Sequence, residues 1–205
     1  MKVMLVNGSP HKNGCTNRAL EEIKGQLEKE GIDTEIFWIG TKGQGCTACF
    51  KCHDAGKCVF DDSVNEFLKK AETADGFIFG SPVYYGSIAG SLKGFMDRLF
   101  SCGSRYLQNK PAASVVSCRR GGATEAFAQM NMYYTMHNMP VVSSQYWNQV
   151  HGFMAEDVEK DAEGLQTMRT LGANMAWLLK CIEAGKKNGV LEPVREQRQV
   201  TNFIR

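Results

Sequence analysis

The chain has 205 residues, which is long enough for one α/β domain with a full hydrophobic core. Its net charge is only +2 and its lysines and arginines are dispersed, which argues against a nucleic-acid binder or a membrane-surface binder. No apolar run is long enough to span a bilayer, and the first residues lack the pattern of a signal peptide. We therefore expect a cytoplasmic protein without nucleic-acid or membrane partners.

Short apolar runs alternate with helical patterns along the chain. The run Lys2–Asn7 shows no polar alternation, which is typical of a strand covered on both faces. Similar runs predict strands at 34–39, 76–80, 112–117 and 139–144, and the helical patterns predict helices at 16–31, 63–73, 88–100, 123–136 and 162–186. We expect Ser81 and Pro82 to end the 76–80 strand.

Five strands that alternate with helices predict an α/β fold of three layers, with helices on both faces of a parallel sheet. With five strands, the order 2-1-3-4-5 is favoured over the six-stranded dinucleotide-binding order. No linker separates two halves, so we expect residues 1–205 to form a single domain, with a cysteine-rich insertion at 40–62 and a tail at 187–205. The tail ends in apolar Phe203 and Ile204, which predicts that it docks on the surface.

Three loops rich in glycine and short polar residues follow the first, third and fourth expected strands, at 8–16, 81–87 and 117–122. In the order 2-1-3-4-5 they meet where strands 1 and 3 diverge, which is where such sheets bind ligands. The first loop leads into a helix N-terminus and fits neither GxxxxGK[ST] nor GxGxxG, so a phosphate monoester suits it better than a pyrophosphate. The alternative is an ordinary turn with Thr16 as the helix N-cap.

The segments NGSPHKNGCTN, SPVYYGSIAGSLKGFMDR and YWNQVHG resemble the NAD(P)H-dependent FMN reductases of the flavodoxin-like superfamily. The resemblance covers nearly the whole chain, including the closing TNFIR. The cysteine segment, CxxCxxC followed by a fourth cysteine, resembles the iron-sulfur flavoprotein branch of that family. The resemblance implies a flavodoxin-like fold, FMN as the bound cofactor, NAD(P)H as the electron donor, and assembly into a homodimer or homotetramer.

The resemblance also implies which residues bind FMN. The first loop would hold the phosphate, the second would lie along the isoalloxazine ring and the third along its other edge, and the matching residues are Ser9, His11, Thr16, Asn17, Pro82, Val83, Tyr84, Tyr85, Gly86, Ser117, Arg119, Gly121 and Gly122. We expect one of Tyr84 and Tyr85 to form an aromatic wall for the flavin and the other to pack in the core. Arg119 or Arg120 would stabilise the anionic reduced flavin, although either could be a solvated loop residue.

Five further residues have a possible role outside the FMN loops or a structural explanation. His151 and Trp147 are candidates to border the nicotinamide pocket, although a lone histidine is more often structural. Lys93, Asp97 and Arg98 have the spacing of pairs on an exposed helix face, where ion pairs contribute little to stability.

Four of the eight cysteines, Cys46, Cys49, Cys52 and Cys58, fall within thirteen residues. The first three are three residues apart and the fourth follows six residues later. This spacing suits one 4Fe-4S cluster wrapped by a tight loop, and ferredoxins use the same CxxCxxC run for their clusters. Zinc knuckles separate two CxxC pairs by a longer spacer, and disulfides are rare in a reducing compartment. A structural zinc ion and a loop of reduced thiols without metal stay open as alternatives.

These features predict an enzyme that takes hydride from NAD(P)H onto FMN and passes electrons to a small-molecule or protein acceptor, with the cluster as a one-electron relay. No Ser/His/Asp triad or carboxylate pair is evident, which fits an enzyme whose cofactor carries the chemistry. The alternative is a flavodoxin-like one-electron carrier without NAD(P)H activity of its own, although such carriers are typically acidic.

Overall fold

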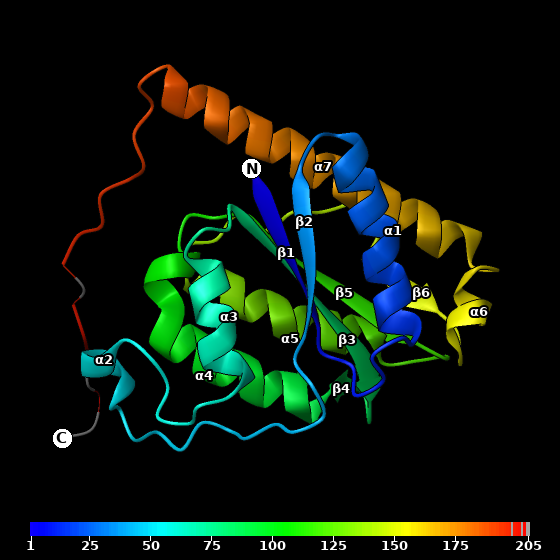
Figure 1. Ribbon diagram of the computed structural model, residues 1–205, viewed down its shortest axis with the longest axis horizontal. Coiled ribbons are helices and arrows are strands. Elements are labelled where there is room, and N and C mark those ends of the chain that lie inside the picture. Colours follow the sequence, from blue (N-terminus) through cyan, green and yellow to red (C-terminus); the bar gives the residue numbers. More distant parts are fainter. Residues whose placement is uncertain (198, 202, 204–205) are drawn as a thin grey trace.

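A parallel β-sheet lies at the centre of the molecule, with helices on both of its faces (Figure 1). The computed structural model describes residues 1–197, 199–201 and 203. The strands are β1 (Lys2–Asn7), β2 (Asp33–Trp38), β3 (Gly76–Tyr84), β4 (Ser87–Ile88), β5 (Ala112–Cys118) and β6 (Gln149–His151). The sheet order is β2-β1-β3-β5-β6, and β4 pairs with the end of β3 outside this path. Without β4, the parallel strands have the predicted order 2-1-3-4-5, and the flavodoxin-like fold class is confirmed.

Seven helices are assigned in the described residues, and five of them pack on the sheet, two on one face and three on the other. They are α1 (Cys15–Lys29), α2 (Cys52–Ala55), α3 (Ser63–Ala71), α4 (Gly90–Leu107), α5 (Ala123–Met136), α6 (Ala155–Val158) and α7 (Ala162–Lys187). Helices α1 and α7 pack on one face, and α3, α4 and α5 pack on the other (Figure 1). Within the described residues, no helix combines the length and apolar character needed to cross a membrane.

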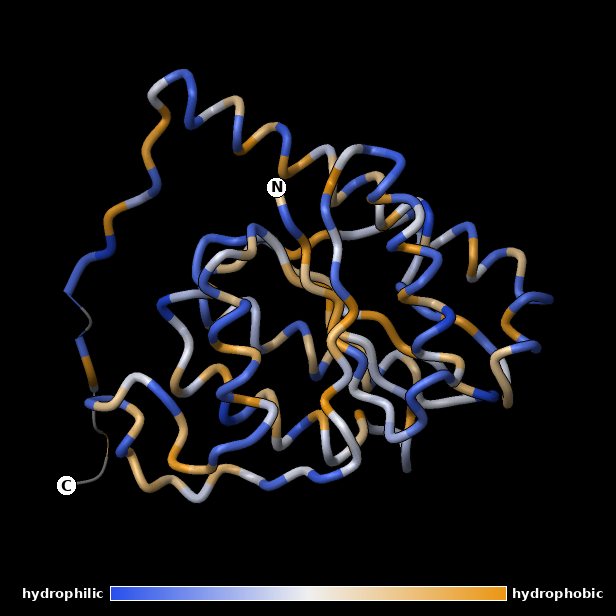
Figure 2. Tube along the Cα trace, in the orientation of Figure 1, coloured by the Kyte–Doolittle hydropathy of each residue, from blue (hydrophilic) through white to orange (hydrophobic). Residues whose placement is uncertain are grey.

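Each face of the sheet has its own hydrophobic core. Side chains alternate along β1, so Val3 and Leu5 join the core under α1 and α7, whereas Met4 and Val6 join the core under α3, α4 and α5. Figure 2 shows the hydrophobic residues concentrated along the central strands. Because both faces are covered, the strand reads as a continuous apolar run in the sequence.

Strand β3 continues to Tyr84, so the expectation that Ser81 and Pro82 end it is wrong. The pairing of β3 with β1 stops at Gly80, whereas its pairing with β5 continues to Pro82. The missing N–H of Pro82 therefore falls where β3 has lost its neighbour on one side, a position at which a strand tolerates proline.

The fifth strand lies later in the chain than predicted. Of the predicted range 139–144, only Val141 forms a bridge, to Ala112, and the fifth strand of the sheet is β6. Between these two pairings the chain leaves the sheet, and the Asn148 side chain donates to the backbone oxygen of Ser114 at 3.0 Å. A side-chain amide thus replaces one backbone partner of β5.

Helix α4 begins two residues later and ends seven residues later than predicted. Ile88, the predicted start, pairs with Val83 in β4. The extension runs through Ser101-Cys102-Gly103-Ser104, whose residues have modest helix propensity. Gly103 lets this extension pack closely on α3, because a Cβ at that position would lie 2.4 Å from a methyl group of Leu68. The remaining predicted strands and helices have bounds within two residues of those in the structure.

The tail contacts the body through polar groups rather than through its apolar end. Glu192 pairs with Lys186 at 3.0 Å and accepts from Asn109 at 3.1 Å, and Arg195 donates to the backbone oxygen of His137 at 3.2 Å. Phe203 is 89% exposed, so the expectation that it docks is wrong, and Ile204 lies outside the described residues.

The aromatic core under α3 and α4 gives a test of this packing. The Phe67 ring is fully buried and lies 5.2 Å from the Phe37 ring and 5.6 Å from the Phe95 ring, measured between centroids. We expect Phe67→Ala to lower the free energy of unfolding by about 3–5 kcal/mol, because it leaves a cavity. The exposed Val194 in the tail gives the control Val194→Ala, for which we expect a change within about 0.5 kcal/mol. Urea denaturation of both variants measures this, and equal losses would contradict the packing.

Candidate functional site

The three glycine-rich loops meet at the carboxyl ends of the central strands. The Gly8 N–H donates to the Gly80 oxygen at 2.9 Å, which joins the first loop to β3. The hydroxyl oxygens of Thr16 and Ser117 lie 2.8 Å apart, which joins the first loop to the third. A Cβ on Gly122 would lie 2.9 Å from the Gly86 Cα, so the second and third loops also touch. The predicted convergence of the loops is therefore present.

Side-chain hydrogen bonds fix the shape of the first loop. The Asn7 side-chain oxygen accepts from the Ser9 N–H at 3.0 Å, and its amide donates to the Lys12 oxygen at 2.9 Å. The Trp38 indole N–H donates to the Ser9 oxygen at 2.8 Å. Sequence reasoning missed Asn7 and Trp38. The one available signal was a polar Asn at the end of an otherwise apolar strand, which must find partners when buried.

The helices that follow the three central strands begin without a side-chain cap. In the part of the chain that the structure describes, no side chain caps α1, α4 or α5, which begin after Gly14, Ala89 and Gly122. By contrast, Asp62 caps α3 and Asp161 caps α7. Uncapped N-terminal N–H groups need other partners, and anions are suitable ones. The loop cluster is thus the place where this fold can accept a phosphate.

The predicted FMN residues divide into a buried group and an exposed group. Ser9, Thr16 and Ser117 are buried where the loops meet. His11, Tyr84, Tyr85, Arg119, Gly121 and Gly122 are exposed, and Asn17, Pro82, Val83 and Gly86 are half-buried. The expectation that one of the two tyrosines packs in the core is therefore wrong. Short hydroxyl side chains form the floor of the loop cluster, and longer side chains surround it.

The four clustered cysteines line one cavity of about 190 Å³ between the 46–60 segment and α4. Cys46 and Cys49 are exposed, whereas Cys52 and Cys58 are half-buried. Burial raises the pKa of the Cys52 thiol, and the nearby Cys49, Cys46 and Cys58 thiols raise it further. In the described residues, no three Cys, His, Asp or Glu side chains are grouped closely enough to hold a single metal ion.

Glycines let the backbone that leads to this cavity lie directly against α4. A Cβ on Gly43 would lie 2.9 Å from the Ser91 Cα, and a Cβ on Gly94 would lie 2.8 Å from the Gln44 oxygen. Ser91 in turn donates to the Gly8 oxygen at 3.5 Å. The segment before Cys46 therefore follows α4 from the loop cluster toward the cysteine cavity.

Arg98 is not the surface residue that the sequence predicted. Lys93 and Asp97 do form an exposed pair, at 3.1 Å. Arg98, however, is buried against a different face of α4 and pairs with Asp62 at 2.7 Å. The helical spacing suggested a surface pair because the sequence alone does not show that α3 and the cysteine loop cover this face.

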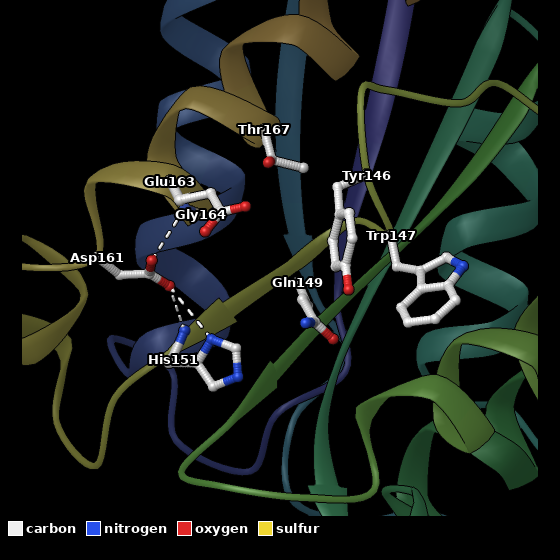
Figure 3. Close-up of a pocket in the computed structure, with 8 residues that line it drawn as sticks. All are labelled: Tyr146, Trp147, Gln149, His151, Asp161, Glu163, Gly164 and Thr167. Atoms are coloured by element: carbon white, nitrogen blue, oxygen red, sulfur yellow. Dashed lines mark hydrogen bonds and ion pairs between the residues drawn. The ribbon is translucent and has the colours of Figure 1, made fainter.

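His151 and Trp147 line a different cavity, also of about 190 Å³, beside β6 and the start of α7 (Figure 3). The Asp161 carboxylate accepts from the His151 backbone N–H at 2.6 Å and from the Gly164 N–H at 2.9 Å. The His151 ring nitrogen Nδ1 lies 3.5 Å from the same carboxylate (Figure 3). These contacts give His151 a structural role at the start of α7.

Comparison with known proteins agrees with this arrangement. The family model of NADPH-dependent FMN reductases matches residues 1–153. An iron-sulfur flavoprotein of Methanocaldococcus jannaschii is 35% identical over 192 residues, which cover 89% of this chain and all of the relative. An FMN-dependent NADPH-azoreductase of Staphylococcus saprophyticus is 30% identical over 103 residues, which cover 48% of this chain and 52% of the relative.

Solved structures support the fold. A crystal structure of RosB superimposes with a TM-score of 0.71 and 15% identity, covering all of this chain and 94% of RosB. A flavodoxin from the Archaea gives a TM-score of 0.60 and 20% identity, covering 88% of this chain and 99% of the flavodoxin. The chain belongs to the family of NADPH-dependent FMN reductases, among the iron-sulfur flavoproteins, and is an NAD(P)H-dependent FMN oxidoreductase.

Proposed function

We propose that the three loops hold FMN, that electrons from NAD(P)H pass on to a small-molecule or protein acceptor, and that Cys46, Cys49, Cys52 and Cys58 hold a 4Fe-4S cluster. The observation that carries the cluster assignment is the single cavity lined by all four cysteine side chains. A 4Fe-4S cluster supplies one-electron transfer when bound, and Cys thiolates are its usual ligands.

The loop cluster fits FMN better than a dinucleotide. The uncapped start of α1 and the buried hydroxyls of Ser9 and Thr16 offer one anion seat, which suits a single phosphate. Tyr84, Tyr85 and Arg119 are exposed near it, where they can border a flat ring and its polar edge. FMN supplies the redox chemistry when bound, and the residues of this chain bind it, orient it and border its reactive face.

The spacing of the cysteines favours a cluster over a zinc ion. Zinc sites of the knuckle type usually take two CxxC pairs separated by a longer spacer. Here Cys46, Cys49 and Cys52 form one CxxCxxC run and Cys58 follows after five residues, which is closer to the cysteine runs that hold 4Fe-4S clusters.

We also propose that the protein assembles into a homodimer or homotetramer. Met132 and Met136 on α5 are exposed and line an apolar groove of about 330 Å³, together with Ile88 beside the second loop. Exposed apolar surface of this kind is typical of contact regions between proteins.

The phosphate seat gives a first test. Thr16→Asp places a carboxylate at the start of α1, where its charge repels the phosphate, so we expect FMN affinity to fall at least ~100-fold, or about 2.7 kcal/mol. Thr16→Ser keeps the hydroxyl that contacts Ser117 and should bind FMN nearly as well as the parent. Flavin fluorescence quenching measures both affinities. Equal FMN affinity in the Asp variant, with the fold intact by circular dichroism, would refute this placement.

The cysteine cavity gives a second test. Protein purified without oxygen and supplied with iron and sulfide should show a broad shoulder in the visible blue in addition to the flavin bands, and Cys49→Ser should abolish this shoulder while the bands of bound FMN remain. Cys181→Ser, at an exposed cysteine on α7 outside the cavity, is the matched control and should keep the shoulder. Elemental analysis that finds zinc in place of iron, or neither metal, would overturn the cluster assignment.

The proposed assembly gives a third test. We expect light scattering at micromolar concentration to give a mass of two or four chains rather than the 22.8 kDa of one. Replacement of two apolar contacts by charge, in the variant Met132→Glu with Met136→Glu, should shift the mass toward one chain if α5 lies in the interface. A monomeric parent protein would contradict the proposed assembly.

A further inference from the structure

A guanidinium group lies buried beside the cysteine cavity. Arg98 is 3% exposed, and its Nη1 and Nη2 donate to the Asp62 carboxylate at 3.2 and 2.7 Å. Its Nη1 also donates to the Sγ atom of Cys58 at 3.5 Å. Its Nε is buried and has no hydrogen-bond partner among the described residues. Asp62 is half-buried, but burial of the Arg98 guanidinium costs free energy that an apolar side chain would not, so stability alone gives a weak reason for this arginine.

Cys58 is held in place more firmly than the other cysteines of the cavity. The Asn65 side-chain oxygen accepts from the Cys58 N–H at 2.9 Å, and its amide donates to the Cys58 oxygen at 3.0 Å. Over the part of the chain that the structure describes, Cys58 is the one of the four whose sulfur accepts a side-chain hydrogen bond. Helix α3 fixes its backbone through Asn65, and helix α4 fixes its sulfur through Arg98.

We infer that Arg98 is a positioning residue that raises the reduction potential of the cluster through its hydrogen bond to Cys58 Sγ. The inference rests on the proposed 4Fe-4S cluster. One-electron reduction adds negative charge to a cluster and its thiolate ligands. A charged N–H donor at one ligand sulfur stabilises that added charge, and hydrogen bonds to sulfur are among the features that set cluster potentials.

The negative charge of Asp62 opposes this effect. A variant at Asp62 should therefore shift the reduction potential in the opposite direction from a variant at Arg98. The Asp62 carboxylate pairs with Arg98 and offsets part of the positive charge at the cavity wall. Asp62→Asn removes that negative charge but keeps a side-chain oxygen that can cap α3, where the carboxylate accepts from the Val64 N–H at 3.1 Å. Loss of Asp62 charge should make reduction of the cluster easier, whereas loss of Arg98 should make it harder.

The experiment compares cluster midpoint potentials in full-length protein loaded anaerobically with iron and sulfide. The potential is followed by the electron paramagnetic resonance signal of the reduced cluster, and the iron content of each variant is measured. For Arg98→Met we expect a roughly tenfold less favourable reduction, or ~59 mV more negative, and for Asp62→Asn a shift to more positive potential. Arg105→Met is the matched control, because Arg105 is an exposed arginine on the same helix that lies against Gly56 rather than a sulfur. Its shift should be much smaller than that of Arg98→Met.

The outcomes separate this inference from the proposed function. Parent protein that takes up no iron and sulfide overturns the cluster and the role of Arg98 together. Parent protein that loads a cluster, with variants at Arg98 and Asp62 that keep its potential or shift it in the same direction, overturns the role of Arg98 alone. Should Arg98→Met fail to fold, Asp62→Asn decides the matter: a positive shift supports the inference and an unchanged potential refutes it.

Discussion

The close approach of β1 and β3 at their carboxyl ends is the constraint on which the loop cluster depends. A Cβ on Gly8 would lie 2.8 Å from the Gly80 oxygen and equally close to Leu92, and a Cβ on Gly80 would lie 2.8 Å from a Thr16 methyl group. Real Cβ atoms do not approach other atoms so closely, so only glycine fits both positions. Their absent side chains let α1 begin directly above β3, which brings the Thr16 hydroxyl to Ser117 on β5.

Helix α4 extends this constraint from the flavin loops to the cysteines. It begins beside the second loop, its first turns support the 43–45 backbone, and its later turns supply Arg98 and Cys102 to the cysteine cavity. Burial raises the pKa of the Cys102 thiol to about 12, so this fifth sulfur is neutral near pH 7 and acts as part of the wall. Both candidate redox sites therefore lie along one regular helix, which fixes their separation more firmly than a loop would.

The sheet order and the loop cluster could be predicted from the sequence because they follow from local patterns: apolar runs, intervening helices and glycine-rich loops. What could not be predicted depends on contacts between distant segments. Trp38 reaches the first loop because it pairs with Asn7 in the register of β2 on β1. Arg98 looks like a surface residue until α3 and the cysteine loop cover it. The fifth strand lies later than predicted because the 139–144 segment reaches β5 at a single bridge, Val141 to Ala112, and the chain returns to the sheet only at Gln149.

The backbone around Cys49 is strained, whereas the backbone at Cys52 and Cys58 is held by the fold. Ala48 and Phe50, on either side of Cys49, have φ angles of +51° and +57°, in the left-handed region that costs residues other than glycine free energy. Phe50 is exposed, so core packing does not fix its conformation. By contrast, Cys52 begins the short helix α2, and Cys58 is held by hydrogen bonds from Asn65 on α3 and Arg98 on α4. The fold thus fixes Cys52 and Cys58, whereas Cys49 lies in a strained, exposed turn. A ligand bound to all four sulfurs would fix the conformation of this turn as well.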